Sequence, residues 1–171
     1  LFRSAVISTS LMSVTAVSAF FVLLVFLLLP WLAPSLDYAD HPSYLWVLAV
    51  VVALDAIQSI LYAYLRYQHK PIKFAALKFS FIILNIALNL IYFMLLPWLY
   101  ERYPDVIGKI YDPTVGVGYA FYLNLVCTGL VTLLFWKEFK SIKFKVDWQL
   151  LKRMLEYTWP LLVLGIVGIL N

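Results

Sequence analysis

The apolar residues of this chain gather in runs of about 20 residues, and no other feature limits its possible folds as strongly. At a rise of ~1.5 Å per residue, a helix of ~20 residues crosses the ~30 Å hydrocarbon core of a membrane. Hydrophobic residues make up 64% of the 171 residues and charged residues only 13%, whereas a soluble domain carries about 25% charged residues. We therefore predict an all-α protein, a polytopic transmembrane helix bundle.

Five membrane segments can be identified in these runs. We expect Pro30 and Pro97 to end the first and the third, because proline cannot continue the hydrogen-bond ladder of a helix. The last segment carries Pro160 in its first turn and has only ~15 residues, too few to span a membrane, so the chain is expected to be an internal piece of a larger protein. The segments run from Ser4 to Leu29, Leu45 to Leu65, Ile72 to Leu96, Val117 to Trp136 and Tyr157 to Asn171.

Lysine and arginine residues lie mainly in the connections on one side of these segments. Arg3 and the connections 66–73 and 137–156 together hold ten of them, whereas connections 31–44 and 98–116 on the opposite side hold two. The positive-inside rule therefore places the first set in the cytoplasm and the second set outside. This placement accounts for the net charge of +4 without a nucleic acid as a partner.

The connection 137–156 ends in a short amphipathic segment. Asp147 is an N-cap type residue, and Trp148, Leu151 and Leu155 follow at positions that share one helix face. We expect a helix in the headgroup layer that leads into the fifth segment. Its basic residues serve either to recruit anionic lipid or a partner or, the alternative that we favour, as a solvated cytoplasmic anchor.

Asp55 is the central residue of the 21-residue span Leu45–Leu65. A carboxylate near the bilayer midplane costs ~2.5–3.5 kcal/mol on insertion scales, so it needs a compensating role. At 100° per residue, Gln58, Ser59 and Tyr62 lie on the same face as Asp55. Two interpretations have equal weight: a cavity wall where Asp55 binds a coupling cation or proton, and a buried Asp55 that is hydrogen-bonded to a neighbouring helix.

The third segment also has a polar face, with Lys78, Asn85, Asn89 and Tyr92. The two asparagines, one turn apart, are expected above all to join helices. Lys78 lies inside the span, where it either extends toward the cytoplasm or offers a cation to an anionic ligand. In the fourth segment, Asn124 shares a face with Cys127 and Thr128, a pattern typical of close helix packing.

Signatures of an enzyme are missing from the sequence. His41 and His69 lie in connections on opposite sides of the membrane, and no HExxH, GxSxG or Walker-type motif occurs. One cysteine, Cys127, excludes a CxxC metal site. We expect neither catalytic residues nor a metal or cofactor.

Several stretches of the chain resemble one family. The sequence Tyr64-Leu-Arg-Tyr-Gln-His-Lys-Pro-Ile-Lys-Phe-Ala-Ala-Leu-Lys78, with Asn85-Ile-Ala-Leu-Asn89 and Leu96-Pro97 after it, resembles bacterial polysaccharide biosynthesis proteins of the O-antigen flippase type. These proteins belong to the multidrug/oligosaccharidyl-lipid/polysaccharide exporter superfamily. The segment Leu150-Leu-Lys-Arg-Met-Leu-Glu-Tyr-Thr-Trp-Pro160-Leu-Leu is similar to the entry of the family's seventh helix.

The resemblance implies helices three to seven of a transporter with 12 to 14 helices in two lobes. Residues 1–136 would supply four transmembrane helices of the N-terminal lobe. Residues 137–156 would form the cytoplasmic connection between the lobes, and residues 157–171 would begin the C-terminal lobe. The membrane would be the bacterial inner membrane, with connections 31–44 and 98–116 facing the periplasm.

The implied function is that of a flippase. Such a protein moves an undecaprenyl-pyrophosphate-linked oligosaccharide, a precursor of lipopolysaccharide O-antigen, from the cytoplasmic to the periplasmic leaflet by alternating access, coupled to an ion gradient. Its partners would be this lipid-linked oligosaccharide, membrane lipids, a polysaccharide polymerase and glycosyltransferases. The substrate path would hold Arg66, Lys70, Lys73, Lys78, Asn85 and Asn89. The ion-coupling or cavity residues would be Asp55, Gln58, Ser59, Tyr62 and Asn124.

Two alternatives stay open. A drug or cation antiporter of the same superfamily would use acidic cavity residues, which Asp55 favours and Lys78 disfavours. A membrane-embedded polysaccharide polymerase or acyltransferase would need catalytic residues on large external loops, and the external connections here are short and hold one histidine.

Overall fold

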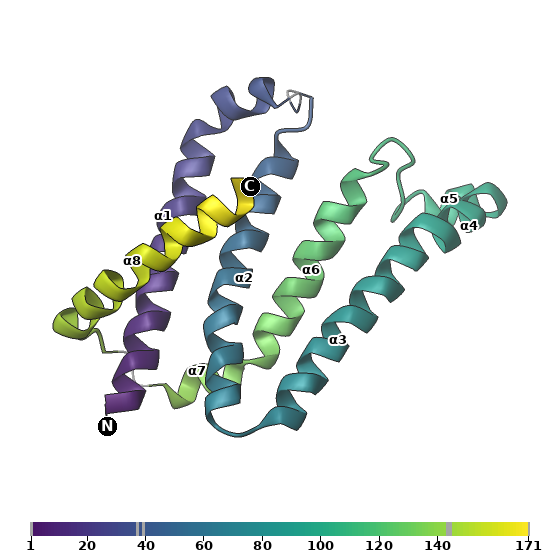
Figure 1. Cartoon of the computed structure of the whole chain (residues 1–171). Helices are drawn as coiled ribbons and strands as arrows, with labels where there is room; N and C mark the ends of the chain where they lie inside the picture. The colour runs from purple at the N-terminus through teal and green to yellow at the C-terminus, as the bar shows by residue number, and fades with distance from the viewer. Residues whose placement is uncertain (1, 37, 39, 143–144, 171) are drawn as a thin grey trace.

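The chain folds as a bundle of helices. The structure, a computed structural model, describes residues 2–36, 38, 40–142 and 145–170. Within these residues the protein is 85% helical and has no strand, which confirms the predicted all-α class. The elements are α1 (Phe2–Ser35), α2 (Ser43–Tyr67), α3 (Pro71–Leu90), the π-helical turn η1 (Ile91–Leu95), α4 (Leu96–Arg102), α5 (Pro104–Ile107), α6 (Gly118–Leu134), α7 (Trp136–Ser141) and α8 (Trp148–Leu170) (Figure 1).

Three helices are long and apolar enough to cross a membrane. They cover Ala5–Ser35, Ser43–Tyr67 and Pro71–Arg102, with 31, 25 and 32 residues. The fourth predicted segment corresponds to α6, whose 17 residues lie at the short end of the range of about 17–25 residues for a spanning helix. The protein is therefore embedded in a membrane.

The prediction that Pro30 ends the first helix is wrong. Pro30 and Pro34 both lie inside α1, which continues to Ser35. A proline removes one hydrogen bond, but ending the helix within hydrocarbon would leave several backbone groups without partners. Continuing the helix is the less costly solution.

Pro97 does not end its helix either. Directly before it, η1 forms a widened turn in which the backbone N–H of Leu96 donates to the carbonyl of Ile91, five residues back. A proline ring meets the carbonyl four residues earlier in a regular helix, and a π turn is one of the known ways to accommodate this. The helix therefore continues through Pro97 to Arg102.

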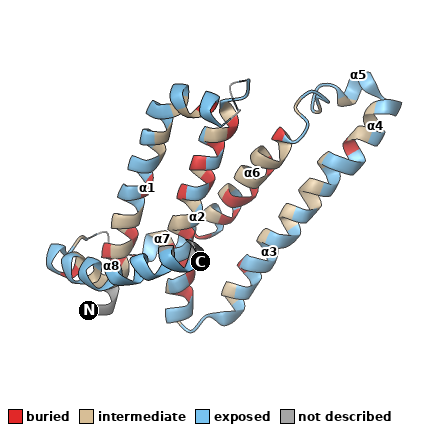
Figure 2. Ribbon diagram, turned by 45° about the horizontal axis from the view of Figure 1, so that its top comes forward, coloured by how far each residue is buried: buried red, intermediate tan, exposed pale blue. Residues whose placement is uncertain are grey.

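The long helices stand side by side, with α2 at the centre. It contacts α1 on one side and α6 on the other, and α3 packs against α6 (Figure 1). Buried residues concentrate on α2 and α6, whereas the outer faces of α1 and α3 are exposed (Figure 2). Residues 68–70 and helix α7 lie at one end, called the basic end below, and residues 40–42 and 103–117 lie at the other.

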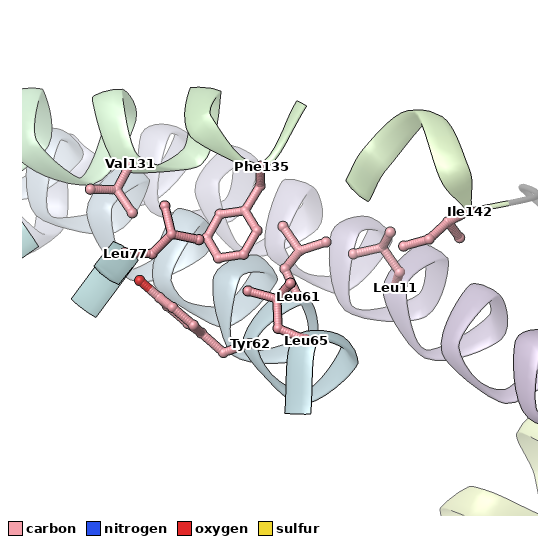
Figure 3. Close-up of a cluster of buried hydrophobic side chains, with 8 residues drawn as sticks. All are labelled: Leu11, Leu61, Tyr62, Leu65, Leu77, Val131, Phe135 and Ile142. Atoms are coloured by element: carbon pink, nitrogen blue, oxygen red, sulfur yellow. The ribbon is translucent and has the colours of Figure 1, made fainter. Parts of the chain in front are cut away.

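The hydrophobic core lies at the basic end, where the helices converge. Its eight buried side chains come from four of the long helices and from the connection after α6 (Figure 3). The rings of Phe135 and Phe74 pack edge-on against the ring of Tyr62, with centroids 4.9 and 5.4 Å away. The cluster contains Leu11, Leu61, Tyr62, Leu65, Leu77, Val131, Phe135 and Ile142.

The segment before α8 is fastened to α1. The Ser8 hydroxyl donates to the Lys145 carbonyl and accepts from the Lys145 N–H, both at 2.8 Å, and the Asp147 N–H donates to the Thr9 hydroxyl at 3.1 Å. Asp147 caps α8 as predicted, because its carboxylate accepts from the N–H groups of Gln149 and Leu150 at 3.1 Å. These bonds fix where α8 begins.

The amphipathic segment and the fifth predicted segment form one continuous helix, α8. Pro160 lies inside it, so it is not in the first turn of a separate helix. Within the described residues, α8 is not among the helices that meet the length and hydropathy of a membrane span. Of its early apolar residues Leu150 is buried, whereas Trp148 and Leu155 are exposed.

The connection 103–117 is organised around Asp112. Its carboxylate accepts hydrogen bonds from the Thr114 hydroxyl at 2.7 Å and from the Thr114 N–H at 2.9 Å, and these bonds lower the pKa of Asp112 below its ordinary value. The Asp112 N–H donates to the Tyr119 hydroxyl on α6 at 2.7 Å. The connection is thereby tied to the start of α6.

Gly118 lets α6 approach α2 closely at the end opposite the basic end. Tyr44 is buried, and its ring stacks between His41 and Phe121 with centroids 4.9 and 5.3 Å away. A Cβ atom on Gly118 would lie 2.1 Å from the Tyr44 hydroxyl oxygen. No side chain larger than hydrogen fits without moving this ring.

We expect Gly118→Ala to lower the free energy of unfolding by about 1–3 kcal/mol, as overpacking of a well-packed site does. Thermal unfolding of the purified protein in detergent measures the effect. Gly129→Ala is the matched control in the same helix, since a Cβ atom there meets nothing within 4 Å. Equal stability of the two variants would contradict the packing argument.

Candidate functional site

A polar cavity of about 280 Å³ lies between α2 and α3. Five of its lining residues are ones that the sequence singled out for their polar character inside the spans. The face of α2 that carries Asp55 and the first half of α3 therefore meet around one space. The lining residues are Asp55, Gln58, Ser59, Tyr62, Lys78 and Phe81.

Asp55 and Lys78 bring opposite charges to this cavity. Both side chains are exposed to it. Among the described residues the Asp55 carboxylate accepts no hydrogen bond and forms no ion pair, and the Lys78 ammonium lies over the Tyr62 ring, 4.3 Å from its centroid. Such a cation–π contact holds a lysine in place and leaves its N–H donors available. The cavity thus offers one anionic and one cationic group.

Gln58 fastens this cavity wall to α6. It is buried, and its Nε2 atom donates to the Thr128 carbonyl at 2.9 Å and to the Thr132 hydroxyl at 2.8 Å. Both N–H donors of the amide are therefore used within the protein. The Ser59 hydroxyl donates to the Ala56 carbonyl of its own helix at 2.7 Å.

The three predicted asparagines lie outside the cavity lining. Asn89 donates from Nδ2 to the Asn85 carbonyl at 2.8 Å and to the Asn85 side-chain oxygen at 3.0 Å, within one helix. Cys127 is buried on α6, the helix against which α3 packs. Asn124, half-buried, lies one turn before Cys127 on α6. The two asparagines, expected to join helices, are thus bonded to each other within α3.

The four basic residues of the expected substrate path lie in different surroundings. Only Lys78 lines the cavity with Asp55. The Arg66 guanidinium lies 5.6 Å from the Phe74 ring centroid and borders another cavity, between α1 and α2. Lys70 is exposed directly before α3. Lys73 forms an ion pair with Glu138 of α7, at 2.5 Å between Nζ and Oε1.

Glu138 was not among the site residues predicted from the sequence. It is 5% exposed, whereas its partner Lys73 is 36% exposed. The signal in the sequence was an isolated acid among the lysines of the connection 137–145. Because Glu138 is the one acid in this connection, it was the residue there that could form an ion pair with a lysine near the start of α3.

The site has the chemistry of binding. No group of three or more His, Cys, Asp or Glu side chains that could hold a metal ion occurs in the part of the chain that the structure describes. Lys78 can hold a phosphate-like anion, and Asp55 can carry a cation or a proton. Phe81 and the Tyr62 ring add apolar surface to the lining of the cavity.

No protein-family model, curated protein or solved structure matches this chain. The resemblance to the O-antigen flippases therefore remains an expectation based on the residues quoted above.

We predict that Lys73→Met lowers the free energy of unfolding by about 1–3 kcal/mol, since it leaves the buried Glu138 carboxylate without its partner. The double variant Lys73→Met with Glu138→Gln removes both charges and should recover most of this loss. Thermal unfolding in detergent compares the variants.

The control is Lys137→Met, which removes an exposed lysine next to Glu138. It should change stability by less than about 0.5 kcal/mol. If the Lys73 variant were as stable as this control, the ion pair would not be a structural element.

Proposed function

We propose that this chain is part of a flippase that moves an undecaprenyl-pyrophosphate-linked oligosaccharide across the bacterial inner membrane. The observation that carries the proposal is the cavity between α2 and α3, which both Lys78 and Asp55 line within apolar helices. Charged residues within membrane segments are costly and mark the paths of ions and polar substrates. The resemblance of the sequence to O-antigen flippases points in the same direction.

The chemistry of such a substrate fits this cavity. Its pyrophosphate needs a cation, which Lys78 supplies with free N–H donors, and its sugars need a polar surface. Lys78 lies seven residues after Pro71, or about 10 Å along α3, so an anion reaches it from the basic end. The polyprenyl tail stays in lipid, along the exposed apolar faces of α1 and α3.

In this proposal the basic end faces the cytoplasm, where glycosyltransferases assemble the substrate, and a polysaccharide polymerase receives it in the periplasm. Movement of one charge across the membrane supplies ~2.3 kcal/mol per 100 mV, enough to drive an alternating-access cycle when several charges move. Asp55 is the group that would carry the coupling cation or proton.

A drug or cation antiporter is the second candidate. The observation in its favour is the Asp55 carboxylate, which accepts no hydrogen bond among the described residues and lines the cavity. A lipophilic cation would bind this carboxylate and be repelled by Lys78. The two candidates therefore predict opposite effects of removing Lys78.

We expect Lys78→Ala to reduce translocation of the lipid-linked oligosaccharide about tenfold or more, because charge-assisted bonds to a phosphate are lost. Asp55→Asn should also reduce translocation, since an amide cannot be protonated or bind a cation by charge. The measurement is the amount of the oligosaccharide accessible on the periplasmic leaflet in cells that express the complete protein.

The controls are Lys109→Ala and Asp105→Asn, both exposed in the connection after α4. All four variants must reach the membrane in equal amounts. Export of a lipophilic cation that rises in Lys78→Ala would favour the antiporter. Unchanged transport of both substrates in the two cavity variants would leave Asp55 and Lys78 with a packing role and overturn the proposal.

A further inference from the structure

A second cavity, of about 670 Å³, lies between α1 and α2. None of the residues that line it also lines the cavity between α2 and α3. The groove is thus separate from the site proposed for transport. Its volume lies within the range of about 300–1,000 Å³ that is usual for ligand sites.

The groove is apolar along its length and cationic at one end. Val6 and Ile7 of α1 form one wall, and Ile60 and Ala63 of α2 form the other. Arg66 stands six residues after Ile60, about 9 Å further along α2, at the basic end. A ligand that fills the groove must therefore combine hydrocarbon with an anionic group.

The N–H donors of the Arg66 guanidinium are available to a ligand. It is exposed, lies over the Phe74 ring, and forms no hydrogen bond or ion pair within the described residues. Two carboxylates that follow α6 interact with other groups: Glu138 pairs with Lys73 through Oε1, and Asp147 caps α8. A guanidinium carries five N–H donors in a fork that matches phosphate geometry.

We propose that this groove binds one anionic phospholipid of the surrounding membrane, with its phosphate on Arg66 and an acyl chain between α1 and α2. Both helices are long enough to span a membrane, and the basic end of α2 marks the level of the headgroups. The apolar walls exclude free phosphate as the natural ligand, because it would leave them uncovered. The bound lipid covers apolar surface that α1 and α2 leave open.

The test compares lipid binding by the purified protein in detergent, with native mass spectrometry to count bound phosphatidylglycerol and phosphatidylcholine. The wild-type protein should retain phosphatidylglycerol in preference. Arg66→Gln should weaken phosphatidylglycerol binding about tenfold, as expected when charge-assisted hydrogen bonds are lost. Arg66→Lys keeps the charge and should lose less.

Ala63→Trp fills the groove without changing its charge, and should reduce binding of both lipids. Arg153→Gln is the matched control, an exposed arginine on α8 outside the groove, and should stay within about twofold of wild type. Equal loss in this control would indicate general surface charge and overturn the proposal.

Further results would also overturn it. One is unchanged phosphatidylglycerol binding in Arg66→Gln or, if that variant does not fold, in Ala63→Trp. Another is displacement of the lipid by inorganic phosphate alone, which would show that the acyl chain contributes nothing.

Discussion

Backbone groups inside a membrane must find hydrogen-bond partners within the chain, because the hydrocarbon offers none. This constraint explains why the long runs of apolar residues are helical and why turns lie at the two ends of the bundle. It also explains why prolines inside α1 are tolerated and why a proline after α3 is met by a widened turn. A proline therefore does not end a helix where the break would expose backbone groups to hydrocarbon.

A few polar contacts determine which helices pair. Membrane helices gain little from burying apolar surface against one another, so close packing and hydrogen bonds decide. Gln58 joins α2 to α6 through the Thr128 carbonyl and the Thr132 hydroxyl. The ion pair of Lys73 and Glu138 adds α7 at the basic end. These contacts leave α2 and α3 apart at the level of Asp55, which is where the cavity lies.

Much of the fold and part of the site were predictable from the sequence, for identifiable reasons. Hydropathy locates the helices, and the period of a helix places Asp55, Ser59 and Tyr62 on one face. That period does not give the rotation of one helix against another. It therefore could not show that Lys78 and Arg66 line different cavities, or that Lys73 forms an ion pair with Glu138. Nor does it show that a helix continues past Pro30 and Pro97, because that outcome depends on the surrounding hydrocarbon.

The widened turn at Ile91–Leu95 also shifts the phase of the helix that contains it. One extra residue in a turn rotates everything beyond it by about 100° relative to a regular helix. One helical period therefore does not predict the faces of the residues both before and after the turn. The first half directs Lys78 to the polar cavity, while Tyr92 within the turn packs against Tyr119, and Tyr100 beyond it packs against Tyr111. A single transmembrane helix can thus line a charged cavity near one end and pack against aromatic rings near the other.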